Sequence, residues 1–472
     1  MTFNSIEFWV FFAAVFSLYL RLGQRKQNWL LLAASYAFYF SIARFFVLLL
    51  CFTTIFDFFC GKMIAQASTP GRRRRYLLLS ILSNISVLLV FKYLDFFSAH
   101  VSQIFGTGTS GVVFNLAVPI GLSFYILQSI SYVIDVYRGD CKAHERISEY
   151  ALYIAFFPQL LAGPIERASR MLPQFGSARA ITGESWKAGL WLCFWGLIEK
   201  CVVSDNLQAR IITPYFQSGG DSNGLSTLLV LWSCSMRIYL DFDGYSNIAR
   251  GVARLMGFDL SANFFLPNYA VSSKDLWRRF HITFYRWARD YIYIPLVKNL
   301  RLPVWVALPV VFILSGLWHQ VSWTFVCWGA FEATVILLSE IPGRFLAPIY
   351  AATRGFPKFL LTVAGLMSTK FFRAISTAFF VAESVPTAMD SIRPVLQLAS
   401  WRLDREFLGL LFLFLFFTLP LRPVEFLQLR KNKLLAPLEL SPPLFAGLLF
   451  FLAIFWVVYG VNAAQRFVYF QF

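Results

Sequence analysis

The sequence predicts an all-α integral membrane protein that crosses the bilayer many times, and three observations point to this fold class. The mean hydropathy is +0.61. Of the 472 residues, 58% are hydrophobic and only 14% are charged, whereas about 25% of the residues of a typical soluble domain are charged. The apolar residues also form runs, many of them near the ~17–25 residues that a helix needs to cross a bilayer.

These runs predict about eleven to twelve membrane-spanning helices. The run 148–164 is apolar as well, but it is short and ends in Pro and Gly, which favours a re-entrant segment buried among helices. The first run lacks a basic leader and a small-residue cleavage site, so we expect a retained span rather than a signal peptide. The predicted spans are 6–22, 28–40, 44–61, 76–92, 116–135, 186–204, 225–242, 303–318, 321–339, 357–381, 406–420 and 443–460.

The basic residues of the loops predict the orientation. Segments 21–28 and 61–75 contain several Lys and Arg residues, whereas 93–115 contains none. Because cytoplasmic loops are enriched in Lys and Arg, the alternation places the N-terminus outside. A last basic loop near 422–433 leaves the C-terminus outside too. The formal net charge of +17 is thereby attributed to loops, and no nucleic-acid partner is expected.

Several common site types are not indicated. The seven cysteines lie mostly in apolar segments, without a CxxC pair or a nearby histidine, so neither a disulfide framework nor a metal site is predicted. The sequence contains no Gly-rich phosphate loop, GxSxG or HExxH motif. It therefore gives no support to soluble-type nucleotide hydrolysis, esterase or zinc-protease mechanisms.

Among the four histidines, His319 is the strongest catalytic candidate. It lies in SGLWHQVSW at the junction of two apolar spans, and residues 302–331 carry no formal charge. Burial without a nearby charge favours the neutral imidazole, which is the form that a general base needs. Gly316 would let another helix or a substrate approach closely. A hydrogen-bonded core histidine remains the alternative, and for His100 and His144 we expect only a solvated role.

The segment around His281 reads KDLWRRFHITFYRWARDYIYIPL. Placed on one continuous helix at about 100° per residue, it gathers four arginines in one quadrant, beside an arc of aromatic residues that includes His281. Such a face fits the entrance for a phosphate-bearing donor, because arginine binds phosphate through a fork of N–H groups. Binding of anionic lipid headgroups is the alternative. The face comprises Trp277, Arg278, Arg279, His281, Phe284, Tyr285, Arg286 and Arg289.

Two carboxylates end an apolar span in YLDFDGYSN. Because a charge at membrane depth is costly, Asp241 and Asp243 are candidates for a functional role, with ion pairing to Arg237 or Arg250 as the alternative. The adjacent charges in LIEKC, at 199 and 200, fit snorkelling at a helix end better than catalysis.

The motifs resemble those of the membrane-bound O-acyltransferase (MBOAT) family, in the branch of the proteins that O-acetylate alginate and transfer D-alanine to teichoic acid. The match runs nearly end to end. It is carried by VPIGLSFYILQSISYVIDVYRG (118–139), ALYIAFFPQLLAGPI (151–165), DFDGYSNIARGVARLMGF (241–258), LWRRFHITFYRWARDYIYIPL (276–296), SGLWHQ (315–320) and FVYFQF (467–472).

The resemblance implies a single membrane domain over residues 1–472, with N-terminal helices in 1–115, a catalytic core in 116–340 and C-terminal helices in 341–472. It implies a ring of helices in which a cytoplasmic tunnel and an external funnel meet near His319, the catalytic histidine, with His281 as the second motif histidine. One departure is Gln320, where the family usually has Gly. This difference affects the expected identity of the acceptor more than the expected reaction class.

The implied activity is transfer of an acyl group, acetyl by analogy, from a cytoplasmic thioester such as acetyl-CoA to a hydroxyl of an exported glycan. The resemblance also implies a periplasmic or extracellular partner acyltransferase that relays the group. We expect the protein itself in the inner membrane of a bacterium, surrounded by membrane lipid, with no bound cofactor or metal. A transporter without chemistry and a non-catalytic scaffold are the alternatives. Candidate donor- or acceptor-binding residues are Trp277, Arg278, Arg279, Tyr285, Arg286, Arg289, Asp241, Asp243, Trp318 and Gln320.

Overall fold

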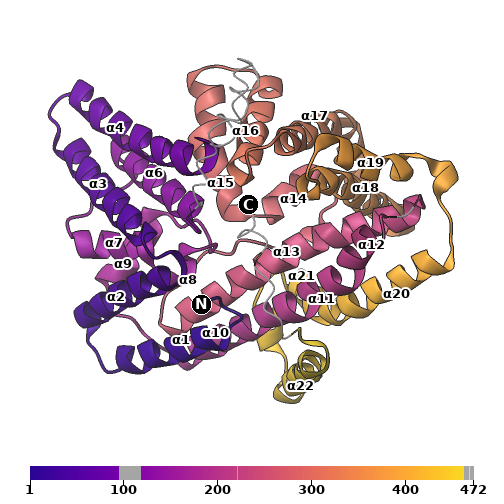
Figure 1. Ribbon diagram of the computed structural model, residues 1–472, viewed down its shortest axis with the longest axis horizontal. Coiled ribbons are helices and arrows are strands. Elements are labelled where there is room, and N and C mark those ends of the chain that lie inside the picture. Colours follow the sequence, from indigo (N-terminus) through magenta and orange to yellow (C-terminus); the bar gives the residue numbers. More distant parts are fainter. Residues whose placement is uncertain (95–118, 221, 462–466, 468–472) are drawn as a thin grey trace, which may run out of the picture. The chain divides into compact units, whose positions relative to one another are not determined.

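The computed structural model describes residues 1–94, 119–220, 222–461 and 467. Every regular element among these residues is a helix, as predicted (Figure 1). His100 and the start of the predicted span 116–135 lie outside the described residues. The chain divides into two compact units, one formed by 1–193 and 246–261 and the other by 194–245 and 262–472.

In the first unit, the helices begin and end where local sequence favours it. Ser5 accepts a hydrogen bond from the backbone of Phe8 and so caps the first helix, and Thr69 caps the fourth with Pro70 in its first turn. Helices α3, α4 and α6 lie side by side (Figure 1). The bounds are α1 Ile6–Tyr19, α2 Gln24–Ala43, α3 Phe46–Gln66, α4 Pro70–Leu88, α6 Leu122–Arg138, α7 Ile147–Ala155, α8 Phe157–Leu160 and α9 Ala168–Gly176.

The segment 148–164 folds as two short helices, α7 and α8, separated at Phe156. A helix of nine residues is about 14 Å long, which is too short to cross ~30 Å of hydrocarbon. Its residues are almost entirely buried. The prediction of a short, buried segment is confirmed, and its re-entrant course stays a prediction.

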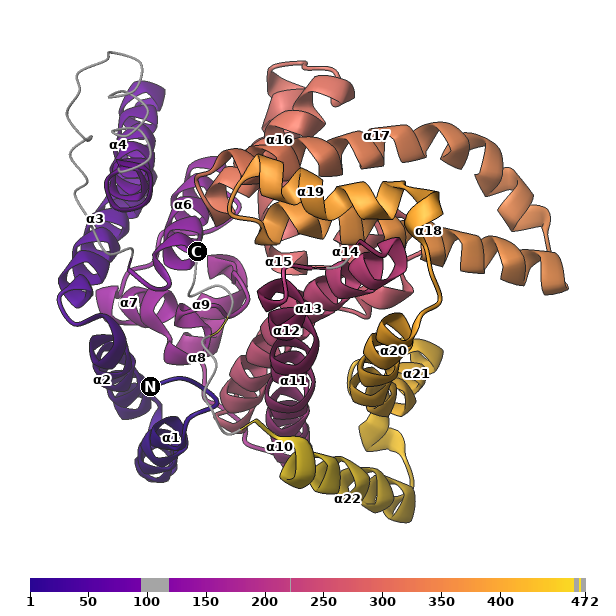
Figure 2. The same cartoon turned by 45° about the vertical axis from the view of Figure 1, so that its right-hand side comes forward.

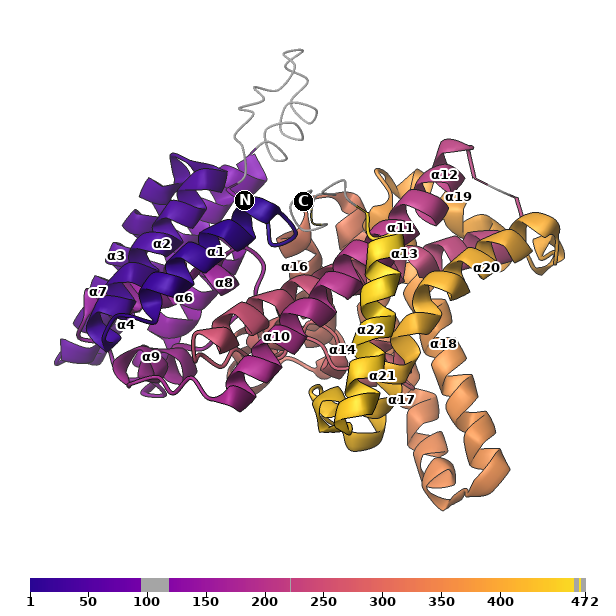
Figure 3. The same cartoon turned by 90° about the horizontal axis from the view of Figure 1, so that it is seen from below.

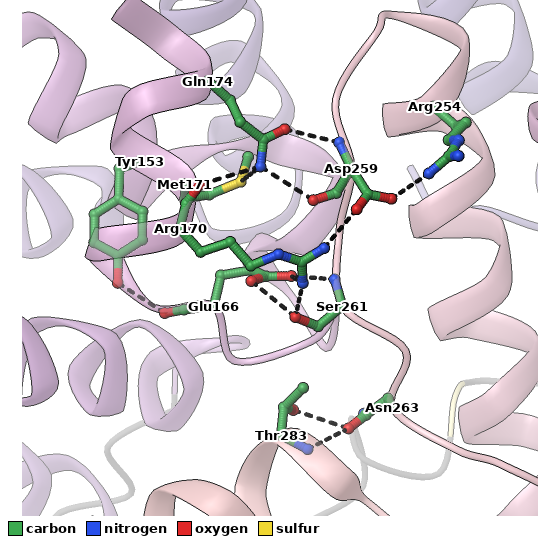
Figure 4. Close-up of polar contacts among 10 residues, drawn as sticks. All are labelled: Tyr153, Glu166, Arg170, Met171, Gln174, Arg254, Asp259, Ser261, Asn263 and Thr283. Carbon is green, nitrogen blue, oxygen red and sulfur yellow. Dashed lines mark hydrogen bonds and ion pairs between the residues drawn. The ribbon is translucent and has the colours of Figure 1, made fainter. Parts of the chain in front are cut away.

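A polar network ties the turn after α8 to the segment after α13 within the first unit (Figure 4). The buried Glu166 accepts hydrogen bonds from the backbone and side chain of Ser261. Asp259 bridges Arg170 and Arg254. Because Glu166 is charged and buried, these donors are what makes its burial tolerable. His144 is 22% exposed, and its Nε2 lies 2.8 Å from Glu149.

Helices α10 (Gly183–Leu197) and α13 (Gly224–Leu255) pack with their backbones close together. In the first unit, a Cβ on Gly251 would lie 2.7 Å from the carbonyl oxygen of Gly189. In the second, a Cβ on Gly244 would lie 2.6 Å from that of Gly196. Only glycine permits this approach.

The second unit contains the remaining long helices. Helices α17 and α18 run side by side as an antiparallel pair (Figure 3), and α19 packs against both (Figure 2). The bounds are α11 Asp205–Leu207, α12 Thr213–Gln217, α14 Ser273–Arg279, α15 Ile282–Ala288, α16 Val304–His319, α17 Trp323–Ala352, α18 Gly355–Val381, α19 Val385–Leu396, α20 Arg405–Thr418, α21 Arg422–Lys431 and α22 Pro442–Tyr459.

Six helical stretches of the described chain are long and apolar enough to cross a membrane. They are 46–66, 70–93, 224–255, 355–381, 405–431 and 442–459, and two further apolar helices, α1 and α16, are shorter. Large apolar side chains on these helices are exposed, among them Phe412 at 66% and Val457 at 85%. These helices agree with the predicted multi-pass membrane protein. The further predicted spans, the ring, the tunnel and the funnel stay predictions.

Candidate active site

The segment around His281 is not one continuous helix. Helix α14 ends at Arg279, Phe280 is extended, and His281 adopts the left-handed conformation with φ = 47° before α15 begins at Ile282. The predicted continuous helix is therefore wrong, and so is the single quadrant of four arginines derived from it. A left-handed residue other than glycine is uncommon in proteins, so the break is a specific feature of this site.

Residues 263–265 hold this break in place. The backbone N–H of Ile282 donates to the carbonyl oxygen of Asn263 at 2.7 Å. The backbone N–H of Phe265 donates to the carbonyl oxygen of Arg279 at 2.9 Å. The side-chain oxygen of Asn263 accepts from the Thr283 hydroxyl at 2.8 Å and lies 3.1 Å from Nδ1 of His281 (Figure 4 shows the contacts of Asn263 with Thr283).

His281 is enclosed by aromatic rings. Its ring centroid lies 4.7 Å from that of Phe242, 5.1 Å from Phe284 and 6.2 Å from Trp318. The side chain is 1% exposed. Burial lowers the pKa of His281 to about 3, because the charged imidazolium is poorly solvated there. His281 is therefore neutral at physiological pH.

His319 is the last residue of α16 and is 6% exposed. Among the described residues, five rings surround its imidazole with centroid distances of 4.9 to 6.2 Å. We call this enclosure the aromatic chamber. It consists of Phe284, Trp318, Phe325, Trp328 and Phe380.

The two histidines share part of this chamber. Phe284 and Trp318 stack on one another at 4.5 Å, and each of the two rings lies near both His281 and His319. The structure thus brings together the two histidines that the sequence singled out, although they are separated by 37 intervening positions (282–318) in the chain.

Close packing of α16 on α17 fixes the position of His319. A Cβ on Gly316 would lie 2.2 Å from the carbonyl oxygen of Phe325, and one on Gly329 would lie 2.4 Å from that of Phe312. The expectation that Gly316 allows a close approach is confirmed, and the approaching element is α17.

A cavity of about 680 Å³ lies beside the chamber and is lined by α14, α15, α16 and α17. Phe284 belongs to its lining and also to the chamber, and Ser315, one turn before His319, lines it as well. Its charged lining residues are Lys274, Arg289 and Glu340, with Lys274 paired to Glu340 at 2.8 Å. The volume suits a ligand larger than a simple acetyl group.

Only some of the predicted donor-binding residues line this cavity. Trp277, Tyr285 and Arg289 line it, whereas Arg278, Arg279 and Arg286 are absent from its lining. Arg279 is instead paired with Asp275 at 2.8 Å. The position of Trp277 is fixed by a hydrogen bond of 2.9 Å from its indole N–H to Glu332.

Glu332 belongs to a buried polar group that the sequence did not reveal. Its carboxylate also accepts from Ser376 and lies 3.5 Å from Arg373, whose guanidinium stacks over the ring of Phe280 at 4.5 Å. The available signal was the presence of Glu332 and Arg373 within the largely apolar helices α17 and α18, because charges in such helices are costly unless paired.

The other predicted residues lie apart from the cavity lining. Asp241 forms an ion pair of 2.5 Å with Lys200, which also binds Asp205 at 2.8 Å. Lys200 and Glu199 are buried, so the expected snorkelling is wrong. Asp243 is buried in α13. Trp318 belongs to the chamber, and Gln320 is an exposed residue directly after α16.

Within the part of the chain that the structure describes, no three His, Cys, Asp or Glu side chains lie close enough to hold a metal ion. The sequence also did not reveal Asn263, Phe325 or Phe380 as site residues. Phe380 lies in FFVAESVPTAM (379–389), and that aromatic pair was a usable signal.

Comparison with known proteins identifies the family. The family model for MBOAT, the membrane-bound O-acyltransferase family, matches residues 31–367. A Pseudomonas aeruginosa protein named "Probable alginate O-acetylase AlgI" is 33% identical over 412 residues, which cover 86% of this chain and 76% of that protein.

More distant relatives have different acceptors in their names. A "Peptidoglycan O-acetyltransferase" of Helicobacter pylori is 30% identical and covers 78% of this chain and 73% of its own length. A "Teichoic acid D-alanyltransferase" of Bacillus subtilis is 25% identical and covers 47% and 59%, respectively. The family match over most of the chain, the apolar helices and these relatives together establish that this chain belongs to the membrane-bound O-acyltransferase family and is a multi-pass membrane acyltransferase.

Proposed function

We propose that this protein moves an acetyl group from a cytoplasmic thioester, acetyl-CoA, to a hydroxyl of an exported glycan or of a relay partner, with His319 as the general base. The observation that carries the proposal is the position of His319. It is buried at the end of α16 inside the aromatic chamber, and one wall of that chamber, Phe284, also lines the 680 Å³ cavity.

In the proposed reaction, His319 takes the proton of the acceptor hydroxyl. The oxygen attacks the thioester carbonyl carbon, the C–O bond forms and the C–S bond breaks. The imidazolium then returns its proton to the leaving thiolate, so that the enzyme ends as it began. General base catalysis of this kind typically contributes about 10²–10⁴ in rate.

The cavity is the proposed donor site. Its apolar and aromatic lining suits the pantetheine arm, and Arg289 and Lys274 supply cations for the donor's phosphates. Lys274 forms an ion pair with Glu340 in the structure, so a donor phosphate would have to displace that carboxylate. Trp277 and Tyr285 would guide the thioester toward Phe284.

The proposed setting is the inner membrane of a bacterium, with both termini outside and the donor entering from the cytoplasm. The relatives' names include alginate, peptidoglycan and teichoic acid, which supports a surface glycan as the acceptor class. A partner acyltransferase outside the membrane would carry the group onward where the first acceptor is a relay hydroxyl.

The test is transfer of labelled acetyl from acetyl-CoA in membranes that contain either the wild type or His319→Ala. We expect the variant to insert normally and to lose at least ~10²-fold in transfer, the lower end of general base catalysis. His144→Ala, which removes a histidine of the first unit, is the matched control and should retain transfer.

Retained transfer in His319→Ala would remove the catalytic role of His319. Glycan modification that persists in cells without any transfer from acetyl-CoA by isolated membranes would instead favour a scaffold or a transporter. Identification of the labelled product by mass spectrometry then names the acceptor.

A further inference from the structure

His281 lies beside Asn263, a residue that the sequence motifs did not single out. Asn263 belongs to the extended segment that follows α13, and it is 1% exposed. Its amide oxygen lies 3.1 Å from Nδ1 of His281. Two hydrogen bonds from Thr283 converge on the same oxygen, one from the hydroxyl at 2.8 Å and one from the backbone N–H at 3.3 Å.

These contacts determine which end of the amide faces the histidine. A backbone N–H can only donate, so the Asn263 atom that it contacts is the oxygen and not the nitrogen. An amide oxygen can only accept. The Nδ1 atom at 3.1 Å from that oxygen must therefore carry the hydrogen.

The contact with the Asn263 oxygen therefore fixes the tautomer of His281. A neutral imidazole carries one hydrogen, and with that hydrogen on Nδ1 the lone pair lies on Nε2. Among the described residues, the rings that contact the imidazole belong to Phe242, Phe264, Phe284 and Trp318, none of which titrates or carries a charge. Such surroundings favour the neutral imidazole, which carries a single hydrogen.

We propose that Asn263 is the positioning residue of His281, holding the imidazole in the tautomer with its hydrogen on Nδ1 so that Nε2 is the accepting nitrogen. The backbone of Asn263 assists, because its carbonyl oxygen binds the N–H of Ile282 at 2.7 Å and so supports the left-handed conformation of His281. This inference rests on the proposed function only for its consequence on rate.

The histidine orientation matters because His281 shares Phe284 and Trp318 with His319. A rotation of His281 would displace Phe284 and Trp318, the two chamber rings that lie near both histidines. A tautomer change would present an N–H donor at Nε2 where an acceptor now lies. Asn263 thereby acts on transfer through His281, without contact with the reacting atoms.

The direct test is nitrogen NMR of detergent-solubilised protein labelled at histidine. The chain has only four histidines, and the His281 signals are assigned by their loss in His281→Gln. We expect the wild type to show a neutral His281 with the hydrogen on Nδ1. A hydrogen on Nε2 would overturn the proposal, whatever the outcome for His319→Ala.

Two variants of Asn263 separate positioning from mere packing. Asn263→Asp keeps an acceptor oxygen and adds a negative charge, which favours the imidazolium. We expect it to keep the Nδ1 hydrogen and part of the activity, and to move the acidic limb of the pH–rate profile to higher pH. Asn263→Leu has a similar size but no acceptor, and we expect it to lose the single tautomer and on the order of 10²-fold in kcat/KM.

Thr283→Val is the matched control, because it removes a second donor from the same oxygen and leaves the histidine contact. It should retain the tautomer. Equal activity and identical pH profiles in all three variants would overturn the positioning role. If His319→Ala retained transfer while the wild-type NMR showed the Nδ1 hydrogen, the proposed function would fail and the tautomer assignment would stand.

Discussion

Two buried regions of the second unit differ in the groups that surround their titratable side chains. Around Lys200, charges are packed together, with Asp205 and Asp241 2.8 and 2.5 Å from its ammonium nitrogen. Around His319, the neighbours are aromatic rings. A charge locked between opposite charges resists any change of protonation, whereas an imidazole among rings can gain or lose a proton without breaking an ion pair. The first arrangement suits a structural role and the second suits catalysis.

The largest effect should come from breaking the ion cluster of Lys200, Asp205 and Asp241. Lys200→Met leaves two buried carboxylates without their cation, and removal of one partner of a buried pair typically costs about 3–5 kcal/mol. We expect a large fall in the thermal unfolding temperature in detergent. The triple variant that also carries Asp205→Asn and Asp241→Asn should recover most of it. A Lys200→Met protein as stable as the wild type would show that the cluster is not structural.

Next in size is a change at the packing that places His319. In Gly316→Ala the new methyl group meets the Phe325 carbonyl oxygen, and overpacking of this kind costs up to about 3 kcal/mol. Acetyl transfer should fall together with stability, because α16 carries His319. Gly447→Ala in α22, where nothing lies within 4 Å of the added carbon, is the control and should change neither. Unchanged transfer in the first variant would argue against tight positioning.

Of intermediate size is the pH dependence that His281 should impart to stability. Its pKa of about 3 lies below the ~6.5 of an exposed histidine, so between these values the unfolded chain binds a proton that the folded chain does not. Stability is therefore complete above pH ~6.5 and falls on acidification, by roughly 2 kcal/mol at pH 5. Thermal unfolding across pH measures this. His281→Gln should have a shallower acid dependence, and an identical slope in both proteins would contradict the assignment.

The smallest effect concerns the donor cavity. Arg289→Ala removes a cation that lines the cavity, and a charge-assisted contact is worth about 1.5–3 kcal/mol at most, less for an exposed side chain such as this one. We expect a few-fold rise in the KM for acetyl-CoA with little change in kcat. Arg278→Ala, at an exposed residue outside the lining, should leave KM unchanged. Equal effects of the two substitutions would favour a diffuse electrostatic role.

The sequence predicted the helical fold and the buried segment 148–164, and it singled out the two histidines that lie near the same rings, because apolar runs and isolated titratable residues are local signals. It failed at the break before Ile282, since RRFHITF contains neither Gly nor Pro and its helical periodicity continues unbroken. The break depends on Asn263, a neighbour in space that lies 18 residues away. The partners Asp241 and Lys200, and Glu332 and Arg373, were equally hidden, because pairing between helices depends on the tertiary fold.

The end of α16 at His319 has a consequence for the charge that forms during transfer. Aligned peptide dipoles place a partial negative charge at the C-terminal end of a helix, and a cation there is stabilised by about 0.3–1 kcal/mol, or ~2 kcal/mol when partly buried. His319 is the last residue of this sixteen-residue helix. If His319 takes up the acceptor's proton as proposed, the carbonyl groups of the last turn would supply the field that an acidic side chain supplies to histidine in a hydrolase triad.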